Sequence, residues 1–302
     1  MQGLYFPLVN VMILLIAGLA YSGEIDSSLP NPYVITYPFK SAVIHYTIKN
    51  EYGHGKISKG TEVVYIKGDR LAKVTKMAIP DPKEMTKTKN VETLQIFTPG
   101  YIYMVDLVEK TGSKIDNSKK YTKPAYDKLS DEEKKAFHRR MERRGIVSLD
   151  LLGLGKKVGT DTVLGRQCDV YQSGKEMSPE ELVAASESGE SPSYMKSWIW
   201  GTAKIPLKVI TAGLGWSNEL IATKIEESVK IPDSQFTAPS DIKVTYDKEK
   251  SEFAKQEALA RFELYKTGKP MVVKTKLKRE EIKPKGDSKA SESNQKSQEN
   301  QK

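Results

Sequence analysis

The sequence is poor in the residues that build metal, haem and thiol sites. Cys168 is the only cysteine among 302 residues, so no disulfide can form within the chain. The three histidines, His45, His54 and His138, stand in no HExxH or CxxCH motif and pair with no cysteine at zinc spacing. We therefore predict no metal site and no cofactor. We also expect Cys168 to occupy a buried strand position, because no histidine or second cysteine lies near it to activate a thiol.

Signatures of nucleotide binding and hydrolysis are missing as well. The chain has no GxSxG elbow and no GxxxxGK[ST] loop, and its glycine-rich stretch from Gly153 to Gly159 has the wrong spacing for a dinucleotide loop. Carboxylates are plentiful, but no pair stands out as a catalytic one. We predict a protein that is not an enzyme and has no catalytic residues, while a hydrolase with a carboxylate site remains a minor alternative.

Long apolar runs are confined to the start of the chain. The segment from Leu8 to Leu19 is apolar and is followed by Ala20-Tyr21-Ser22, which has the shape of a secretory signal and its cleavage site. Pro7 lies just before this segment and Asn10 within it, so the stretch makes a poor membrane-spanning helix. We expect residues 1–22 to be a cleaved signal peptide and the mature protein to be soluble in the periplasm; an uncleaved anchor is the alternative.

Positive charge exceeds negative charge, with 48 Lys and Arg against 39 Asp and Glu and a formal net charge of +9. Such a balance favours anionic partners, for example a membrane surface or an acidic polymer. An exported setting argues against nucleic acid. The excess continues into residues 271–302, where Lys, Glu, Ser, Gln and Asn leave almost nothing to bury, so we predict a disordered basic tail.

The centre of the chain alternates apolar and polar residues in short runs that are rich in β-branched and aromatic side chains and bounded by turn residues. Lys67-Gly68-Asp69-Arg70 separates two of these runs as a tight turn, with Gly68 free to adopt a positive φ. The pattern predicts a mainly β (α+β) fold, with a curved antiparallel sheet or an incomplete β-barrel and covering helices. The predicted strands are 42–48, 61–66, 71–77, 93–97, 101–106, 161–171, 194–200, 206–211 and 219–229.

Helical signals interrupt and follow this sheet pattern. Ser130 followed by Glu133 is a capping box that opens a charged helix ending at about Arg144. A more apolar helical piece is predicted at 146–154, and Ser178 with Glu181 opens a short decorating helix. A C-terminal helix is predicted at Asp247 to Lys266, within a segment bounded at 241–270.

Large rings in or beside the strands are the best candidates for a ligand site. Trp198 and Trp200 are two positions apart, so they share one face of a strand, and Tyr101 and Tyr103 do the same. Such rings can line an apolar cavity or simply pack in the core. The sequence leaves these two interpretations open.

The order of these features resembles the lipoprotein-localisation superfamily (LolA/LolB-like), as an uncharacterised periplasmic branch. The resemblance covers roughly Val34 to Pro239. It rests on the Lys67–Arg70 turn, the interrupting helical pair, Leu164–Tyr171, Ile205–Lys208 and Ile231–Pro239. The chain departs from the lipid-anchored members because no cysteine follows the cleavage site, and its long basic tail is unlike the simple carriers.

The resemblance implies an incomplete antiparallel barrel over residues 23–240, with a concave apolar face that holds acyl chains. It implies a periplasmic, non-enzymatic binding or carrier protein for lipid, lipoprotein or another hydrophobic ligand. Arg70 lies near the place of an arginine that closes the lid in that family. The alternative is an envelope scaffold or interaction protein whose sheet is filled by its own side chains; its protein partner is unknown.

Overall fold

The computed structural model describes residues 31–34, 36–52, 56–80, 87–143, 155–178, 180–181, 184 and 193–270. The predicted signal peptide, the predicted helical piece at 146–154 and the predicted basic tail lie outside these residues. Within the described part of the chain, no helix is long and apolar enough to cross a membrane.

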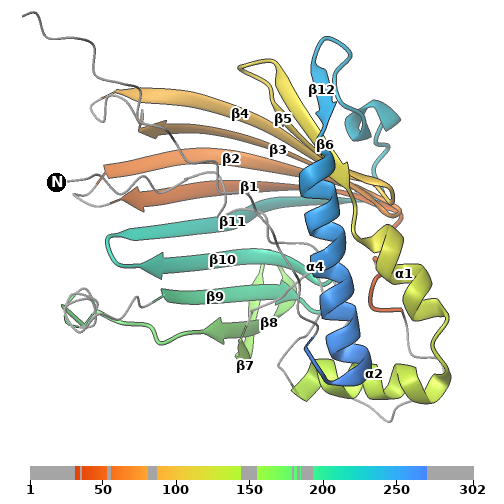
Figure 1. The fold of residues 1–302 in the computed structure, drawn as a ribbon. Coiled ribbons are helices and arrows are strands. Elements are labelled where there is room, and N and C mark those ends of the chain that lie inside the picture. Colours follow the sequence, from red (N-terminus) through yellow and green to blue (C-terminus); the bar gives the residue numbers. More distant parts are fainter. Residues whose placement is uncertain are drawn as a thin grey trace, which may run out of the picture.

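Twelve strands form one open sheet in the order β12-β6-β5-β4-β3-β2-β1-β11-β10-β9-β8-β7 (Figure 1). The strands are β1 (Ser41–Tyr52), β2 (Lys56–Lys67), β3 (Arg70–Pro80), β4 (Thr88–Phe97), β5 (Tyr101–Asp106), β6 (Thr111–Asp116), β7 (Lys156–Val163), β8 (Arg166–Ser173), β9 (Ser193–Trp200), β10 (Ile205–Gly213), β11 (Trp216–Glu227) and β12 (Lys243–Tyr246).

Two antiparallel meanders make up the sheet, one from β1 to β6 and one from β7 to β11. The pairing of β1 with β11 joins them, so residues near the two ends of the domain meet at its centre, as in the pair Ile48 and Leu220. The short strand β12 then extends the sheet by running parallel to β6. The predicted class, a mainly β open sheet with helices, is confirmed, although the β12–β6 pair makes the sheet mixed instead of purely antiparallel.

Tight turns set the register of the hairpins. Gly68 has φ of 59° in the two-residue turn between β2 and β3, as the sequence predicts. Leu164 (φ 49°) and Gly165 (φ 70°) form a second such turn, between β7 and β8. The expected single strand at 161–171 was therefore wrong: two consecutive positive φ values match the twist of a hairpin and reverse the chain there.

The described residues contain three α-helices, α1 (Lys119–Asp127), α2 (Asp131–Arg143) and α4 (Lys248–Thr267), and a 3-10 turn, η2 (Asp233–Phe236). Figure 1 shows the helices gathered near one end of the strands, with α4 running across the strand direction. The predicted capping box opens α2: the Ser130 backbone N–H donates to Glu133 Oε2 at 2.9 Å, and Glu133 N–H donates to Ser130 Oγ at 3.2 Å.

The helices share an aromatic core of their own. Phe137 of α2 is fully buried and packs against Tyr126 of α1 and both Phe262 and Tyr265 of α4, with ring centroids 5.4 to 5.5 Å apart. Arg140 of α2 donates to the Tyr265 carbonyl at 2.9 Å, near the C-terminus of α4. Because these contacts join α1, α2 and α4 to each other, we call the three helices the helical unit.

Candidate ligand-binding site

One face of the sheet centre carries a large apolar cluster. Ile44, Tyr46 and Ile48 alternate along β1, and their register partners on the neighbouring strands include Val64 on β2 and Leu220 on β11. We call the cluster to which they belong the apolar face. It also includes Ile66, Leu71, Cys168, Val170, Trp198, Trp200, Ala203, Ile205, Leu207, Val209 and Ala222, all exposed by 7% or less.

Cys168 takes the buried strand position that the sequence predicts. It is fully buried on β8. Burial raises the pKa of its thiol to about 11, so the side chain stays protonated at neutral pH and behaves as a small apolar group.

Trp198 and Trp200 of β9 both belong to the apolar face, but each ring is also held by polar neighbours. The Trp198 indole N–H donates to Asp161 Oδ2 at 2.8 Å, and Lys208 Nζ lies 4.7 Å from its ring centroid. The pKa of Asp161 is lowered mainly by a hydrogen bond from the Thr162 backbone N–H, and further by this bond from Trp198. Arg166 lies over the Trp200 ring at 4.9 Å. Whether either ring lines a ligand cavity stays a prediction.

Tyr101 and Tyr103 lie on β5, in the other wing of the sheet. Tyr101 is 37% exposed and lies beneath Lys114 Nζ, 4.8 Å from the ring centroid. Tyr103 packs against a second apolar cluster, around Ile96 and Phe236. Because β4, β3, β2, β1, β11 and β10 separate β5 from β9, the structure does not bring the two tyrosines together with the two tryptophans.

Arg70, the predicted lid residue, begins β3 and holds the turn η2. Its guanidinium donates to Asp233 Oδ1 at 2.9 Å and stacks 4.8 Å from the Phe236 ring centroid. Lys67 donates to the same carboxylate oxygen at 2.9 Å. The hydrogen bond from Lys67, and to a smaller extent the one from Arg70, holds the pKa of Asp233 below its ordinary range. These contacts fasten the chain that follows β11 to the β2–β3 turn. A role for Arg70 in closing a lid stays a prediction.

A charged pair that the sequence analysis missed lies among the apolar side chains. Glu62 of β2 and Lys73 of β3 form an ion pair of 3.4 Å, with only 3% and 8% of their side chains exposed. The Thr75 hydroxyl donates to Glu62 Oε2 at 2.9 Å. Tyr46 is the register partner of Glu62; burial raises the pKa of its phenol, and the negative charge of Glu62 raises it further. One signal was available, since Glu62 is in phase with the inward-facing Val64 and Ile66.

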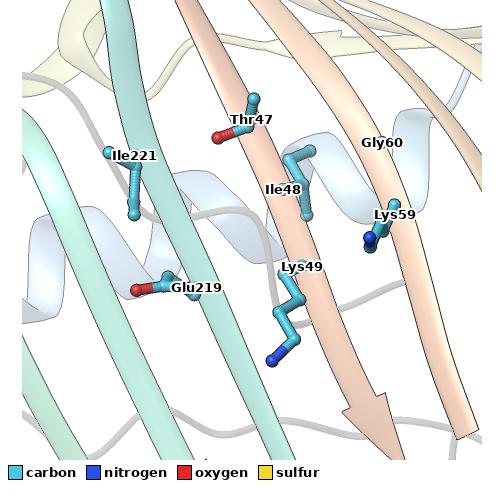
Figure 2. A pocket seen from close by; sticks show the side chains of 7 residues that line it. All are labelled: Thr47, Ile48, Lys49, Lys59, Gly60, Glu219 and Ile221. Atoms are coloured by element: carbon cyan, nitrogen blue, oxygen red, sulfur yellow. The ribbon is translucent and has the colours of Figure 1, made fainter.

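A shallow pocket of about 240 Å³ lies on the opposite face of the same strands (Figure 2). Thr47 and Lys49 of β1 alternate with Ile48, and their partners on β11 are Ile221 and Glu219. Thr47 and Lys49 are exposed, and the lining is mixed in charge. Ile48, a member of the apolar face, also lines the pocket, so the two adjoin at this residue. The described residues also contain no group of three or more His, Cys, Asp or Glu side chains that could hold a metal ion.

No family model matches the chain, and no curated protein matches it in sequence. Solved structures with some likeness include an uncharacterised conserved protein from Thermus thermophilus, with 8% identity, 67% of this chain and 90% of that chain covered, and a TM-score of 0.35. Another is the Mycobacterium tuberculosis lipoprotein LppX, with 13% identity, 65% and 91% covered, and a TM-score of 0.28. MucB in complex with MucA(peri) shares 12% identity, 67% and 56% covered, and a TM-score of 0.32. At these values the likenesses assign neither family nor function.

Proposed function

We propose that the protein is a non-enzymatic carrier that binds a hydrophobic ligand, such as an acyl chain or a lipoprotein, against the apolar face. The observation that carries the proposal is the extent of the cluster: it runs without a break across β3, β2, β1, β11, β10, β9 and β8 of an open sheet. A contiguous apolar surface of this kind is what a long, featureless chain requires, because binding it needs area more than polar recognition.

We infer that the helical unit acts as a movable cover for the ligand. Its buried aromatic core shares no residue with the apolar face. It is fastened to the sheet near β6, where Asp116 N–H donates to Ser251 Oγ at 3.1 Å and Asp247 N–H donates to the Lys114 carbonyl at 2.9 Å. A unit that keeps its own core can shift relative to the sheet without losing its internal packing.

The energy of such binding is adequate without specific contacts. Each buried CH2 contributes about 0.8 kcal/mol, so ten of them give about 8 kcal/mol before ordering costs. That gross value corresponds to roughly micromolar affinity. Some of it would be offset by the cost of opening the face.

Native mass spectrometry of the protein purified from its own envelope tests the proposal by looking for a retained lipid. A fluorescent fatty acid then serves as a probe in two matched variants on β11. Leu220→Ala alters the apolar face, whereas Ile221→Ala alters the opposite face of the same strand. We expect weaker probe binding in Leu220→Ala only, measured far below its melting temperature. If the purified protein retains no lipid and also shows no saturable probe binding, the carrier function is refuted.

A second candidate, an envelope scaffold with a self-filled sheet, is favoured by one observation. The apolar face is already almost fully buried, with exposures of 7% or less in the absence of any ligand. Under this function the sheet would bind no probe, and the wild-type protein would retain no lipid.

The proposed setting is the periplasm, after removal of residues 1–22. The support is the apolar segment from Leu8 to Leu19 and the small residues that follow it. N-terminal sequencing of the exported form should find a start near Gly23. An exported protein that still begins at Met1 would contradict cleavage.

A further inference from the structure

The buried ion pair in the apolar face is incompletely satisfied. Lys73 carries three N–H donors, but in the described part of the chain its ammonium has one ionic partner, Glu62 Oε2 at 3.4 Å. Glu62 accepts one hydrogen bond, from the Thr75 hydroxyl, at that same oxygen. Among the described residues no second partner contacts the other Glu62 oxygen or the remaining Lys73 donors, and neither group is a fully buried polar group without a hydrogen bond. Both are therefore within reach of a polar group that enters this site.

The sheet gains little stability from such a pair. The free-energy cost of removing two charges from water is about as large as the gain from their attraction. Apolar residues of similar volume therefore often stabilise a fold as much as a buried ion pair, or more. Tyr46, beside Glu62, does not complete the pair, because its hydroxyl donates to the Pro206 carbonyl at 2.9 Å. A charged pair that is costly, mostly buried and open to further hydrogen bonds within an apolar face has the features of a recognition site.

The charge of the site selects its occupant. Glu62 and Lys73 together are neutral, so a ligand with a net charge would leave one buried charge uncompensated. A group that carries both signs adds no net charge and can pair its anion with Lys73 and its cation with Glu62. A primary ammonium also donates hydrogen bonds to the free carboxylate oxygen, which a quaternary ammonium cannot do.

We propose that Glu62 and Lys73 bind the zwitterionic phosphoethanolamine headgroup of a phospholipid, with its phosphate on Lys73 and its ammonium on Glu62. This inference rests on the proposed carrier function and names its ligand class. The register supports the placement of the chains. Lys73 is opposite Val64, Val64 is opposite Ile44, and the apolar face continues from there across β11 to Val209 on β10. Acyl chains attached to a headgroup at β2 and β3 thus have the buried side chains of the apolar face beside them, which they contact when the face opens.

The test compares three lipids that carry the same fluorescent acyl chain. Their headgroups are phosphoethanolamine, phosphoglycerol and none, the last being diacylglycerol. Transfer from quenched donor vesicles to the wild-type full-length protein is measured for each. We expect the first lipid to bind at least about tenfold more tightly than either of the others. Two charge-assisted contacts distinguish it from diacylglycerol, whereas the ammonium contact with Glu62 and the neutral charge balance distinguish it from phosphoglycerol. Equal affinities, or a preference for phosphoglycerol, would overturn the proposal.

The double variant Glu62→Gln, Lys73→Met removes both charges and leaves no unpaired buried ion. It should lose the headgroup preference while still binding diacylglycerol, and circular dichroism checks that it folds. A retained preference would refute the assignment of these two residues. The wild-type comparison decides the ligand class even if the variant does not fold. Failure of the wild-type protein to take up any of the three lipids would instead refute the carrier function itself.

Discussion

Replacing Trp198 separates a structural ring from a ligand-binding one. The ring is 7% exposed, and a buried Trp→Ala change typically costs about 3 to 5 kcal/mol of unfolding free energy. Trp198→Phe keeps most of the apolar volume but loses the 2.8 Å hydrogen bond to Asp161. Because Asp161 is exposed and can turn to water instead, this change should cost only about 1 kcal/mol.

Urea unfolding followed by circular dichroism measures both changes. Trp216→Ala is the matched control, since that ring is 38% exposed and its loss should cost about 1 kcal/mol. If Trp198 also lines a ligand cavity, replacing Trp198 and Trp200 together by Ala should weaken binding of an apolar fluorescent probe more than the loss of stability explains. An unchanged unfolding free energy in Trp198→Ala would refute the reasoning from burial.

Three further expectations concern other parts of the chain. Phe137→Ala should destabilise the helical unit by about 3 to 5 kcal/mol, and hydrogen exchange should show the loss in the helices before the sheet; uniform loss would contradict a separate helical core. The folded-state pKa of Asp233 is lowered by Lys67 and Arg70, so its stabilising effect is present above an unfolded pKa of about 3.9 and is lost as pH falls through the folded pKa. The variant Asp233→Asn should therefore lose less unfolding free energy than the wild type as the pH falls, and an equal loss in both proteins would argue against this linkage. Removing residues 271–302 should leave the melting temperature nearly unchanged but reduce salt-sensitive binding to anionic vesicles; unchanged vesicle binding would dispose of a tether, and a large drop in melting temperature would show that the tail belongs to the fold.

Much of the sheet could be predicted from local patterns. The strands of the first meander alternate clearly, and the turns at Gly68 and at Gly100 carry their usual residues. The helix expected at Asp247 to Lys266 is observed as α4, capped by the Asp247 side chain, which accepts from Lys250 N–H at 2.9 Å. The elements α1, β6 and β12 were missed, and β6 is the one strand of the first meander that was not predicted. Pro124 inside α1 is a helix-breaking signal, and β12 is only four residues long.

The candidate site was harder to predict, for a physical reason. Alternation shows which residues share a face of one strand, but it does not show which strands become neighbours. The pairing of β1 with β11 places β5 and β9 in different wings, so Tyr103 and Trp198 lie apart although both are on strands. Glu62 and Lys73 did not stand out among the many charged residues, because burying a charge is normally unfavourable. Only the cross-strand register shows that each one compensates the other.

The central β1–β11 pairing also governs how the chain can fold. His45 and Glu226 are 181 positions apart in sequence, yet they hydrogen-bond across this seam at 3.1 Å. Contacts of such long range slow folding, because a large loop must close before they can form. Until β11 emerges, β1 is an unpaired edge strand with apolar side chains, and such edges aggregate. Formation of this seam therefore has to wait until β11 is available, and a chain that lacks β11 exposes one edge of β1.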